Sequence, residues 1–456
     1  MRERLIEYGE KLLYFFQNRK FADLRMTLLE MEPQDIAEFI EENLEENEKP
    51  MFFRLLPKDL ASDVFIETDS DTQENLILAF TDKELKAIID NMFLDDTVDI
   101  IEEMPANVVK RILKNSDPEN RKQINELLEY PDDSAGSIMT TEFVSLKKNL
   151  TVEKAFNKLK RTGINKETVY TCYVTDDKKH LLGVVTVKDM LLAEDEDTME
   201  QIMDSSVITA KTHDDKEQVA LTLSKYDFLA LPVIDNEGCI VGIVTVDDAV
   251  DVIQEEATED IQKMTAILPT EKPYLKQNIF EIFKVRIPWL MLLMISATFT
   301  SLILNAYEAS LASTLLIACI PMLMGTAGNA GGQASVMVIR ALALGEIEFK
   351  DIFRVLWKEL SASLLLALTL GSVCFLKLIL IDNLIFGYEY TLILSLIVSL
   401  SLTATVILSK IVGCILPLIA KKIHLDPAVV ASPFITTIID ALSLLIYCFI
   451  AGALLI

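Results

Sequence analysis

The sequence is poor in basic residues and in histidine. It carries 42 Lys and Arg against 69 Asp and Glu, a formal net charge of −27, and only 3 His. Most of the acidic excess lies before Lys276, so the front of the chain is a polyanion. Such a charge repels nucleic acid and attracts cations, although on soluble proteins much of it is a solvated surface. We therefore expect no nucleic-acid partner.

Paired cysteines, a leader segment and a phosphate-binding loop are also missing. The 6 Cys form no CxxC pair and four of them fall in apolar runs, which argues against disulfides and zinc sites. No positively charged, apolar leader opens the chain, so we expect no cleavable signal peptide and a cytoplasmic N-terminal half. Without a glycine-rich phosphate loop, ATP-driven pumping is not expected. We expect the protein not to be an enzyme.

Residues 1–130 read as helical, and one motif recurs in them at intervals of 23 to 25 residues. Its copies are "PQDIAEFI" from Pro33, "PKDLASDV" from Pro57, "DKELKAII" from Asp82 and "PANVVKRI" from Pro105. Each copy joins a helix-start signal to an amphipathic helix that is too short to be stable alone. The repeat therefore predicts that stacked units form a small α-superhelix.

A second repeat occupies residues 131–252, where strand and helix signals alternate. "GVVTVKDM" from Gly183 is echoed by "GIVTVDDA" from Gly242. This pattern resembles a tandem pair of CBS domains. The resemblance implies a regulatory module that often binds adenine nucleotides such as ATP. Its nucleotide contacts would be Thr186, Asp189, Thr245 and Asp248. The alternative is that the pair binds nothing and serves as a dimerising scaffold, because many CBS pairs do so.

An acidic helix and linker over residues 253–275 lead to a membrane-like region, residues 276–456. Five apolar runs there reach the ~20 residues that a spanning helix needs. They lie near Ile287 to Asn305, Ala312 to Ile339, Val355 to Leu380, Thr391 to Ile419 and Ala428 to Ile456. The predicted fold is multidomain: a cytoplasmic α-superhelical domain and an α/β tandem CBS pair, followed by a five-helix all-α transmembrane domain.

Loop charges predict the orientation of these spans. Lys and Arg cluster before the first span, after the second and after the fourth, whereas the loops "NAYEAS" and "IDNLIFGYEY" have none. Basic loops face the cytoplasm, so we expect the N-terminus inside and the C-terminus outside a plasma (inner) membrane. The segment "GEIEFKDIFRVLWKEL", residues 345–360, is charged, and we expect it to lie along the inner membrane surface.

Polar residues inside the apolar runs point to an ion pathway. Asp440 lies twelve residues after Ala428, which at ~1.5 Å per residue is roughly 18 Å into a ~30 Å hydrocarbon core. A carboxylate at that depth is costly and marks an ion or proton pathway by default. We expect no Lys, Arg or His at matching depth in another span. Asn329 and Gln333, four residues apart, share one face of the second span.

Oxygen ligands without His or Cys suit a hard cation such as Mg²⁺, which binds one or two carboxylates and retains waters. One chain supplies one deep carboxylate. A twofold homodimer with the pore on its axis would supply two, and so match a divalent charge. The nearby glycines have a simpler explanation too, since small residues tighten many helix pairs in membranes.

"PMLMGTAGNAGGQA" from Pro321 and "DPAVVASPFITTIID" in the fifth run are similar to the signature segments of the MgtE family of magnesium channels. The order of superhelix, CBS pair, acidic helix and five spans also resembles that family, over essentially the whole chain. The resemblance implies that Asp440 is the pore carboxylate, with Gly328, Asn329 and Gln333 in the second-span motif. Ala327 and Ser443 stand where family members often have glycine.

The acidic helix is the candidate sensor of cytosolic Mg²⁺. Asp247, Asp251, Glu255 and Glu259 are spaced by four, so they repel one another along one face. Asp248, Glu256 and Asp260 flank them, and a second cluster in the helical domain comprises Asp95, Asp96 and Asp99. The resemblance implies that the clusters face each other, and bound Mg²⁺ would then favour a compact, closed state. The alternative is a solvated surface.

The hypothesis is an Mg²⁺ uptake channel that cytosolic Mg²⁺ closes, with membrane lipid, Mg²⁺ and a second copy as partners. A coupled divalent-cation carrier or exporter is one alternative, although it would need a second intramembrane site. A membrane metal or nucleotide sensor that transports nothing is the other, and it would leave Asp440 unexplained.

Overall fold

The computed structural model describes residues 2–163, 166–270, 272, 274–307, 314–429 and 432–455. The expected start of the second span at Ala312, the end of the loop "NAYEAS", Val430 and Ala431 in the fifth-span signature, and Ile456 lie outside the described residues. The chain divides into two compact units, Met1–Ile253 and Gln254–Ile456. Each unit is described by itself.

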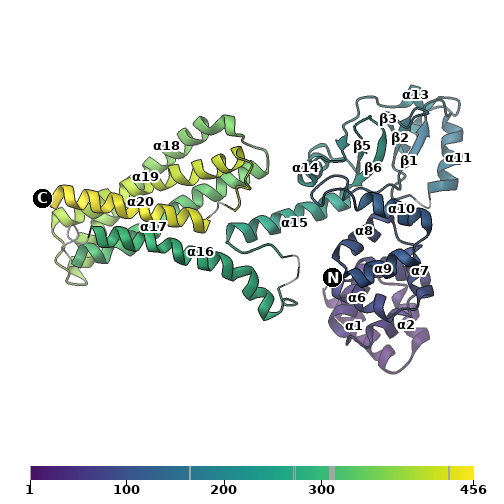
Figure 1. Ribbon diagram of the computed structural model, residues 1–456, viewed down its shortest axis with the longest axis horizontal. Helices are drawn as coiled ribbons and strands as arrows, with labels where there is room; N and C mark the ends of the chain where they lie inside the picture. The colour runs from purple at the N-terminus through teal and green to yellow at the C-terminus, as the bar shows by residue number, and fades with distance from the viewer. Residues whose placement is uncertain are drawn as a thin grey trace. The chain divides into compact units, whose positions relative to one another are not determined.

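The first half of the N-terminal unit is entirely helical. Its helices are α1 (Arg2–Gln17), α2 (Phe21–Leu28), α3 (Pro33–Asn43), α4 (Lys49–Phe53), α5 (Lys58–Ile66), α6 (Ser70–Ala79), α7 (Asp82–Ile89), α8 (Leu94–Glu103), α9 (Ala106–Asn115) and α10 (Pro118–Leu127). The copies of the sequence motif start α3, α5, α7 and α9, with a further helix between each two. Neighbours in that series pack on one another, α3 on α5, α5 on α7 and α7 on α9. The predicted stack of repeats is therefore present, in purple and blue in Figure 1.

Local signals explain where these helices begin. Pro33 occupies the first turn of α3, and Pro57 and Pro105 are the N-caps of α5 and α9. Proline suits a helix start because its fixed φ angle costs nothing there and its missing N–H would have no helical partner. α7 begins instead with a capping box between Thr81 and Glu84. The buried residues of all four helices belong to one hydrophobic core.

The second half of the unit contains two small sheets with the same topology. In the first, β1 (Val144–Lys147) pairs in parallel with β2 (Thr171–Thr175), which pairs antiparallel with β3 (Leu181–Thr186). In the second, β4 (Ala210–Lys211), β5 (Ala230–Ile234) and β6 (Ile240–Thr245) repeat that arrangement. The accompanying helices are α11 (Val152–Thr162), α12 (Val187–Leu192), α13 (Met199–Ile202) and α14 (Lys216–Tyr226). The sequence repeat is thus a structural repeat.

Each copy of the second motif must begin with glycine, because a methionine from another segment lies close to the backbone at that position. A β-carbon at Gly183 would stand 2.7 Å from Sδ of Met203, and one at Gly242 would stand 2.6 Å from Sδ of Met139. Each methionine precedes a residue that makes a bridge to the strand, Asp204 to Val184 and Thr140 to Ile243. The two halves of the repeat therefore use the same contact.

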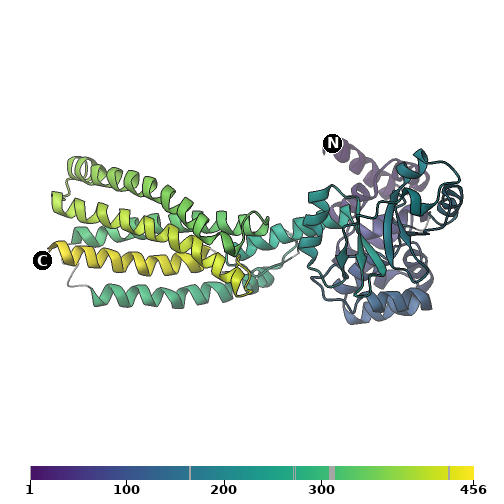
Figure 2. The ribbon, with the colours of Figure 1, turned by 90° about the horizontal axis from the view of Figure 1, so that it is seen from above.

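Helix α15 (Val246–Met264) contains the boundary between the units, and five long helices follow it: α16 (Ile279–Ala306), α17 (Thr314–Ala343), α18 (Ile352–Leu376), α19 (Leu392–Lys422) and α20 (Ser432–Leu455). A 3-10 turn, η3 (Phe349–Asp351), precedes α18, and a π-helical stretch, η4 (Lys377–Asp382), continues it. Among the described residues, five helices are long and apolar enough to span a membrane. Figure 2 shows them running alongside one another.

The bundle is organised around α17 and α19. α19 packs on α17, α18 and α20, while α20 also packs on α17 and α16. Residues 345–360, which we expect to lie along the inner membrane surface, do not form a separate helix. After a turn at Gly345, which has a φ angle of +65°, the segment enters η3, and from Ile352 it forms the first turns of α18. Within these charged first turns of α18, Glu359 forms an ion pair with Lys410 of α19.

Candidate functional site

Asp440 lies in the third turn of helix α20, against helix α17. Its Oδ1 atom is 3.8 Å from the point where a β-carbon on Gly328 would stand, and Cγ2 of Thr436 is 2.9 Å from the same point. Thr436 is one turn before Asp440, so this whole face of α20 follows α17 closely. Since α20 begins at Ser432, Asp440 is ~12 Å along it. The structure thus brings together the Asp440 and Gly328 that the sequence singled out.

Asn329 and Gln333 lie on the exposed side of α17, whereas the alanine and two glycines between them are buried. Amide groups on the open face of an apolar helix would lack partners in lipid, where an unsatisfied polar group costs several kcal/mol. The polar face of α17 is therefore suited to water, an ion or another protein surface. Thr436 and Asp440 are half-buried beside this helix.

Small residues allow three helices to meet next to these polar groups. Gly331 of α17 contacts the backbone of Gly413 in α19, and Ser409 O of α19 is 3.0 Å from where a β-carbon on Gly331 would be. The side chain of Ile439 in α20 reaches the same position. Ala327, where family members often have glycine, packs in an apolar cluster with Ile435 and Ile439. Its methyl group is thus accommodated, and Ser443 is likewise buried.

The expectation that no basic residue lies at the depth of Asp440 is wrong. Ser409 and Ile439 both meet Gly331, so their neighbours Lys410 and Asp440 are level to within about one turn of helix. Lys410 is 8% exposed, and its Nζ lies 3.6 Å from Oε2 of Glu359 in α18. Sequence reasoning missed this pair because it assigned Glu359 to a surface segment.

A cluster of five carboxylates occupies the N-terminal unit, formed by Asp95, Asp96, Glu142, Glu167 and Asp248. Burial, with help from Asp248, raises the pKa of Asp96 to about 6. Burial, with Asp96, Asp247 and Asp248 near it, raises the pKa of Glu167 to about 7. Burial, with Asp96, Asp248 and Glu167 near it, holds the pKa of Asp95 well above its usual range. Each group therefore resists ionisation in the absence of a cation.

The cluster has oxygen atoms available for a cation. Among the described residues, Asp95 Oδ1, Glu142 Oε2 and Glu167 Oε2 are buried without a hydrogen-bond partner. Buried polar atoms of this kind usually have partners, and their absence calls for an explanation. In the described part of the chain, no three acidic, His or Cys side chains converge as a ready-made metal site. The oxygen-only donors fit a hydrated Mg²⁺ bound through retained waters.

Glu142 and Glu167 were not predicted. Glu142 precedes β1 and Glu167 precedes β2, so neither belongs to an acidic run or to a helical spacing. The two segments are joined by a backbone hydrogen bond from Glu167 N to Glu142 O, 3.0 Å long. The sheet therefore brings both carboxylates to the side of α8 and α15, and no local sequence signal could have revealed this.

The acidic residues predicted to form one face of α15 lie in three different environments. Asp247, Asp251 and Glu255 are exposed, and Asp248, which flanks that face, reaches the cluster with Asp95 and Asp96. At the far end Glu259 pairs with Lys263, whose Nζ is also 2.7 Å from Asp426 Oδ2. Glu256 and Asp260 are half-buried, and in the helical domain Asp99 is exposed on α8.

The predicted nucleotide contacts also shape the fold. Thr186 and Asp189 form the capping box of α12, with Thr186 Oγ1 2.6 Å from Asp189 Oδ2. Thr245 and Asp248 repeat this pair at the start of α15, at 2.5 Å. Capping alone accounts for both pairs. Asp248 lies in the acidic cluster, where a phosphate group would be repelled.

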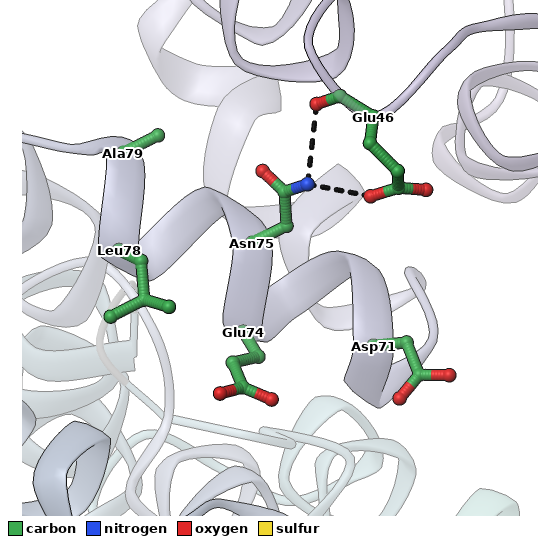
Figure 3. A pocket seen from close by; sticks show the side chains of 6 residues that line it. All are labelled: Glu46, Asp71, Glu74, Asn75, Leu78 and Ala79. Atoms are coloured by element: carbon green, nitrogen blue, oxygen red, sulfur yellow. Dashed lines mark hydrogen bonds between the residues drawn. The ribbon is translucent and has the colours of Figure 1, made fainter.

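An open acidic hollow lies beside α6. It is lined by Glu46, Asp71, Glu74, Asn75, Leu78 and Ala79. The amide of Asn75 donates to the backbone oxygen of Glu46 at 3.2 Å and to its carboxylate at 2.5 Å. Figure 3 shows the carboxylates of Glu46, Asp71 and Glu74 pointing in different directions. The hollow is therefore ordinary acidic surface.

Similarity to known proteins extends over most of the chain. The family described as "Divalent cation transporter" (MgtE) matches residues 320–450, the "MgtE intracellular N domain" matches residues 31–133, and the "CBS domain" matches residues 135–196 and 199–255. The protein named magnesium transporter MgtE of Thermus thermophilus is 35% identical over 437 residues, covering 95% of each chain. That of Bacillus subtilis is 32% identical over 448 residues, covering 97% of this chain and 96% of its own.

A solved structure resembles the front of the chain. The cytosolic domain of the Mg²⁺ channel MgtE in complex with ATP aligns with a TM-score of 0.51 and 33% identity. It covers 54% of this chain and 99% of that structure.

Proposed function

Because the chain belongs to the MgtE family of magnesium transporters, which are not enzymes, we propose that it is a channel for Mg²⁺ uptake that cytosolic Mg²⁺ closes. Entry of a divalent ion down a membrane potential of about 100 mV releases ~4.6 kcal/mol, so no other energy source is needed. The proposed division of labour assigns sensing to residues 1–130, the CBS pair to residues 131–252, the acidic connection to residues 253–275 and permeation to residues 276–456.

The contact between Asp440 and α17 is the observation that carries this proposal. Asp440 lies against Gly328, and Asn329 and Gln333 stand on the exposed face of the same apolar helix. A carboxylate with amide and backbone oxygens offers the hard ligands that Mg²⁺ prefers. We assign the ion path to these four residues, with Asp440 as the charged ligand.

The path would lie between two copies of the chain. One copy supplies one Asp440, and a twofold axis beside α17 and α20 would bring two carboxylates to a divalent ion. The second copy would also cover the exposed amides of α17. From the positive-inside rule we also propose that the N-terminus lies in the cytoplasm and the C-terminus outside the plasma membrane.

The carboxylate cluster of the N-terminal unit is the proposed Mg²⁺ sensor. Besides burial, Asp96 and Asp248 raise the pKa of Asp95, and Asp248 raises that of Asp96, so the cluster is strained when its groups are ionised and no cation is bound. Mg²⁺ would relieve this repulsion and stabilise the compact, closed state. Asp99 and the acidic residues Asp247, Asp251, Glu255, Glu256 and Glu259 are proposed as further ligands.

ATP is a second proposed ligand, at the CBS pair. The likeness to the cytosolic domain solved with ATP supports this proposal, and Thr186 and Asp189 are its candidate contacts. Thr245 is the equivalent residue of the second half, but its partner Asp248 faces the carboxylate cluster. ATP is therefore expected to regulate and not to supply energy.

A coupled carrier is the second candidate function, because the spans contain more charge than the sequence suggested. Lys410 and Glu359 form an ion pair at the depth of Asp440. Recording from the purified protein in planar bilayers, with Mg²⁺ varied on one side, distinguishes the candidates. A channel gives discrete openings that become rarer as cytoplasmic-side Mg²⁺ rises. Flux without unitary currents would favour the carrier, and absence of any flux would favour a sensor.

A further inference from the structure

The ion pair between Lys410 and Glu359 is the strongest feature that the proposed ion path leaves unused. Lys410 lies twelve residues before the end of α19 at Lys422, ~18 Å from that end, and it is well inside an apolar helix. Its side chain is 8% exposed and that of Glu359 is 23% exposed. Charged residues inside spanning helices are costly and by default functional.

Stability alone does not account for this pair. The two charged atoms are 3.6 Å apart, and among the described residues Glu359 Oε2 is buried without a hydrogen-bond partner. Replacing a buried ion pair by apolar side chains of similar size is often neutral or stabilising. A pair that served only to hold α18 on α19 would therefore be easily replaced.

The position of Lys410 connects the pair to α17. Ser409, its neighbour, places its carbonyl oxygen 3.0 Å from the β-carbon position of Gly331, and Gly413 lies backbone to backbone with Gly331. Because these contacts are between backbone atoms, no side chain can change its rotamer to absorb a movement of either helix. A change in the height or rotation of α19 at Lys410 must therefore move α17 at Gly331.

From Gly331 the contacts continue to Asp440. The side chain of Ile439 meets Gly331, and one turn earlier on α17 Gly328 lies against Thr436 and Asp440. The ion pair, the crossing of α17 with α19 and the crossing of α17 with α20 thus form one continuous series of contacts. Asn329 lies between Gly328 and Gly331 along α17, and therefore between the two crossings.

We infer that Lys410 and Glu359 are positioning residues for the ion path. Their attraction fixes α19 on α18 at the level where α19 supports α17, and so sets the distance between the α17 amides and the Asp440 carboxylate. Mg²⁺ demands nearly ideal ligand geometry, so this distance affects selectivity as well as rate. The inference rests on the proposed role of Asp440.

The test compares single and compensated variants of the full-length protein in liposomes, with Mg²⁺ and Ca²⁺ influx measured over a range of concentrations. Glu359→Gln and Lys410→Gln each break the pair. We expect each to raise the Mg²⁺ concentration for half-maximal influx by about tenfold, equivalent to ~1.4 kcal/mol, and to lower the ratio of Mg²⁺ to Ca²⁺ influx. The exchanged variant K410E/E359K should restore both quantities to within about threefold.

Two further variants separate positioning from stability. Asp382→Asn breaks a second ion pair of the spans, in which Lys377 Nζ is 2.7 Å from Asp382 Oδ2. It should lower the melting temperature and leave the half-maximal concentration unchanged. The apolar variant K410M/E359L avoids an unpaired charge if the single variants do not fold, and it should fold yet show the reduced Mg²⁺ selectivity.

Wild-type half-saturation and selectivity in the folded single variants, or in K410M/E359L, would overturn the inference. So would failure of the folded exchanged variant to recover either quantity. Asp440→Ala, measured in parallel, distinguishes failure of the proposed ion path from failure of the positioning role. Wild-type influx in that variant defeats the proposed ion path, whereas loss of influx there combined with unchanged kinetics in Glu359→Gln defeats the positioning role alone.

Discussion

Asp440 and Gly328 meet where α20 packs on α17, with the carboxylate Oδ1 3.8 Å from the point that a β-carbon on residue 328 would occupy. The same point is 2.9 Å from Cγ2 of Thr436, which is too close for a methyl group. Glycine at this position therefore lets α20 approach α17 closely and keeps the carboxylate beside the α17 backbone. Close approach at small residues is a general feature of membrane helix pairs.

Replacing Gly328 with Ala should separate the two helices at Asp440. Because the added methyl group meets Thr436, α20 must shift or Thr436 must change its rotamer. We expect Mg²⁺ influx into liposomes to fall about tenfold, equivalent to ~1.4 kcal/mol. Thr436→Ser removes the obstructing methyl group and keeps the hydroxyl that bonds to Pro433 O at 3.0 Å. The double variant G328A/T436S should therefore recover most of the influx, and an inactive but folded double variant would contradict the contact as described.

The acidic face of α15 can be tested against the alternative of a solvated surface. Replacing Asp247, Asp251, Glu255 and Glu259 with Ala removes the proposed ligands together with their mutual repulsion. We expect the channel to respond weakly to Mg²⁺ at any level, and Mg²⁺ to protect the cytoplasmic region from protease much less than in the wild type. A solvated face predicts a slightly more stable helix, by a few tenths of a kcal/mol per removed repulsion, and unchanged gating.

A control removes acidic charge from elsewhere in the same unit. Asp71→Ala combined with Glu74→Ala changes the hollow on α6 and leaves the proposed sensor intact. This variant should keep wild-type protection. If the fourfold α15 variant also keeps wild-type protection and gating, its carboxylates are surface charge and the sensor lies elsewhere.

Protonation of the carboxylate cluster should stabilise the compact state, as Mg²⁺ binding is proposed to do. Burial raises the pKa of Asp96 to about 6 and that of Glu167 to about 7, above the ordinary values of 3.8 and 4.5. Between about pH 7 and pH 4 the folded cluster thus holds protons that the unfolded chain has released, so the compact state gains stability as pH falls and loses it as pH rises. Without Mg²⁺, protease protection of the full-length protein should increase from pH 8 to pH 5.5.

Saturating Mg²⁺ should flatten this pH dependence, because the cation then neutralises the same carboxylates. Glu167→Gln should flatten the upper part of the profile, near pH 7, in the absence of Mg²⁺. Protection that is independent of pH, or that grows as pH rises, would be incompatible with a cluster of buried, mutually repelling carboxyl groups.

The arrangement of domains could be predicted because sequence repeats mark the two N-terminal domains and long apolar runs mark the spanning helices. The motif copies from Pro33 to Pro105 start α3, α5, α7 and α9, and the copies at Gly183 and Gly242 lie in β3 and β6. Helix-start signals and strand patterns act over a few residues, so a single sequence reveals them. Asp440 and Gly328 could be singled out because a charge or a run of glycines is conspicuous in an apolar helix.

Contacts between distant segments could not be predicted in the same way. Glu142 and Glu167 join the carboxylate cluster only because a sheet brings them beside α8, and their local sequence is unremarkable. Glu359 lies in a charged segment that seemed unable to enter the membrane. Its partner is 51 residues away in the chain, and only the packing of α18 on α19 reveals the pair.

The most direct test of the account is Mg²⁺ influx through variants of Asp440 in liposomes, measured with an enclosed Mg²⁺-sensitive dye. Asp440→Ala and the isosteric Asp440→Asn should each reduce influx by at least about 100-fold, equivalent to ~2.7 kcal/mol, because both remove the carboxylate that lies beside the α17 motif. Asp382→Asn, which removes a buried carboxylate from η4 in the same helical unit, should retain influx. Size-exclusion chromatography and melting temperature establish that each variant is folded and keeps its wild-type assembly. Near wild-type Mg²⁺ influx through folded Asp440→Asn would contradict the assignment of Asp440 to the ion path.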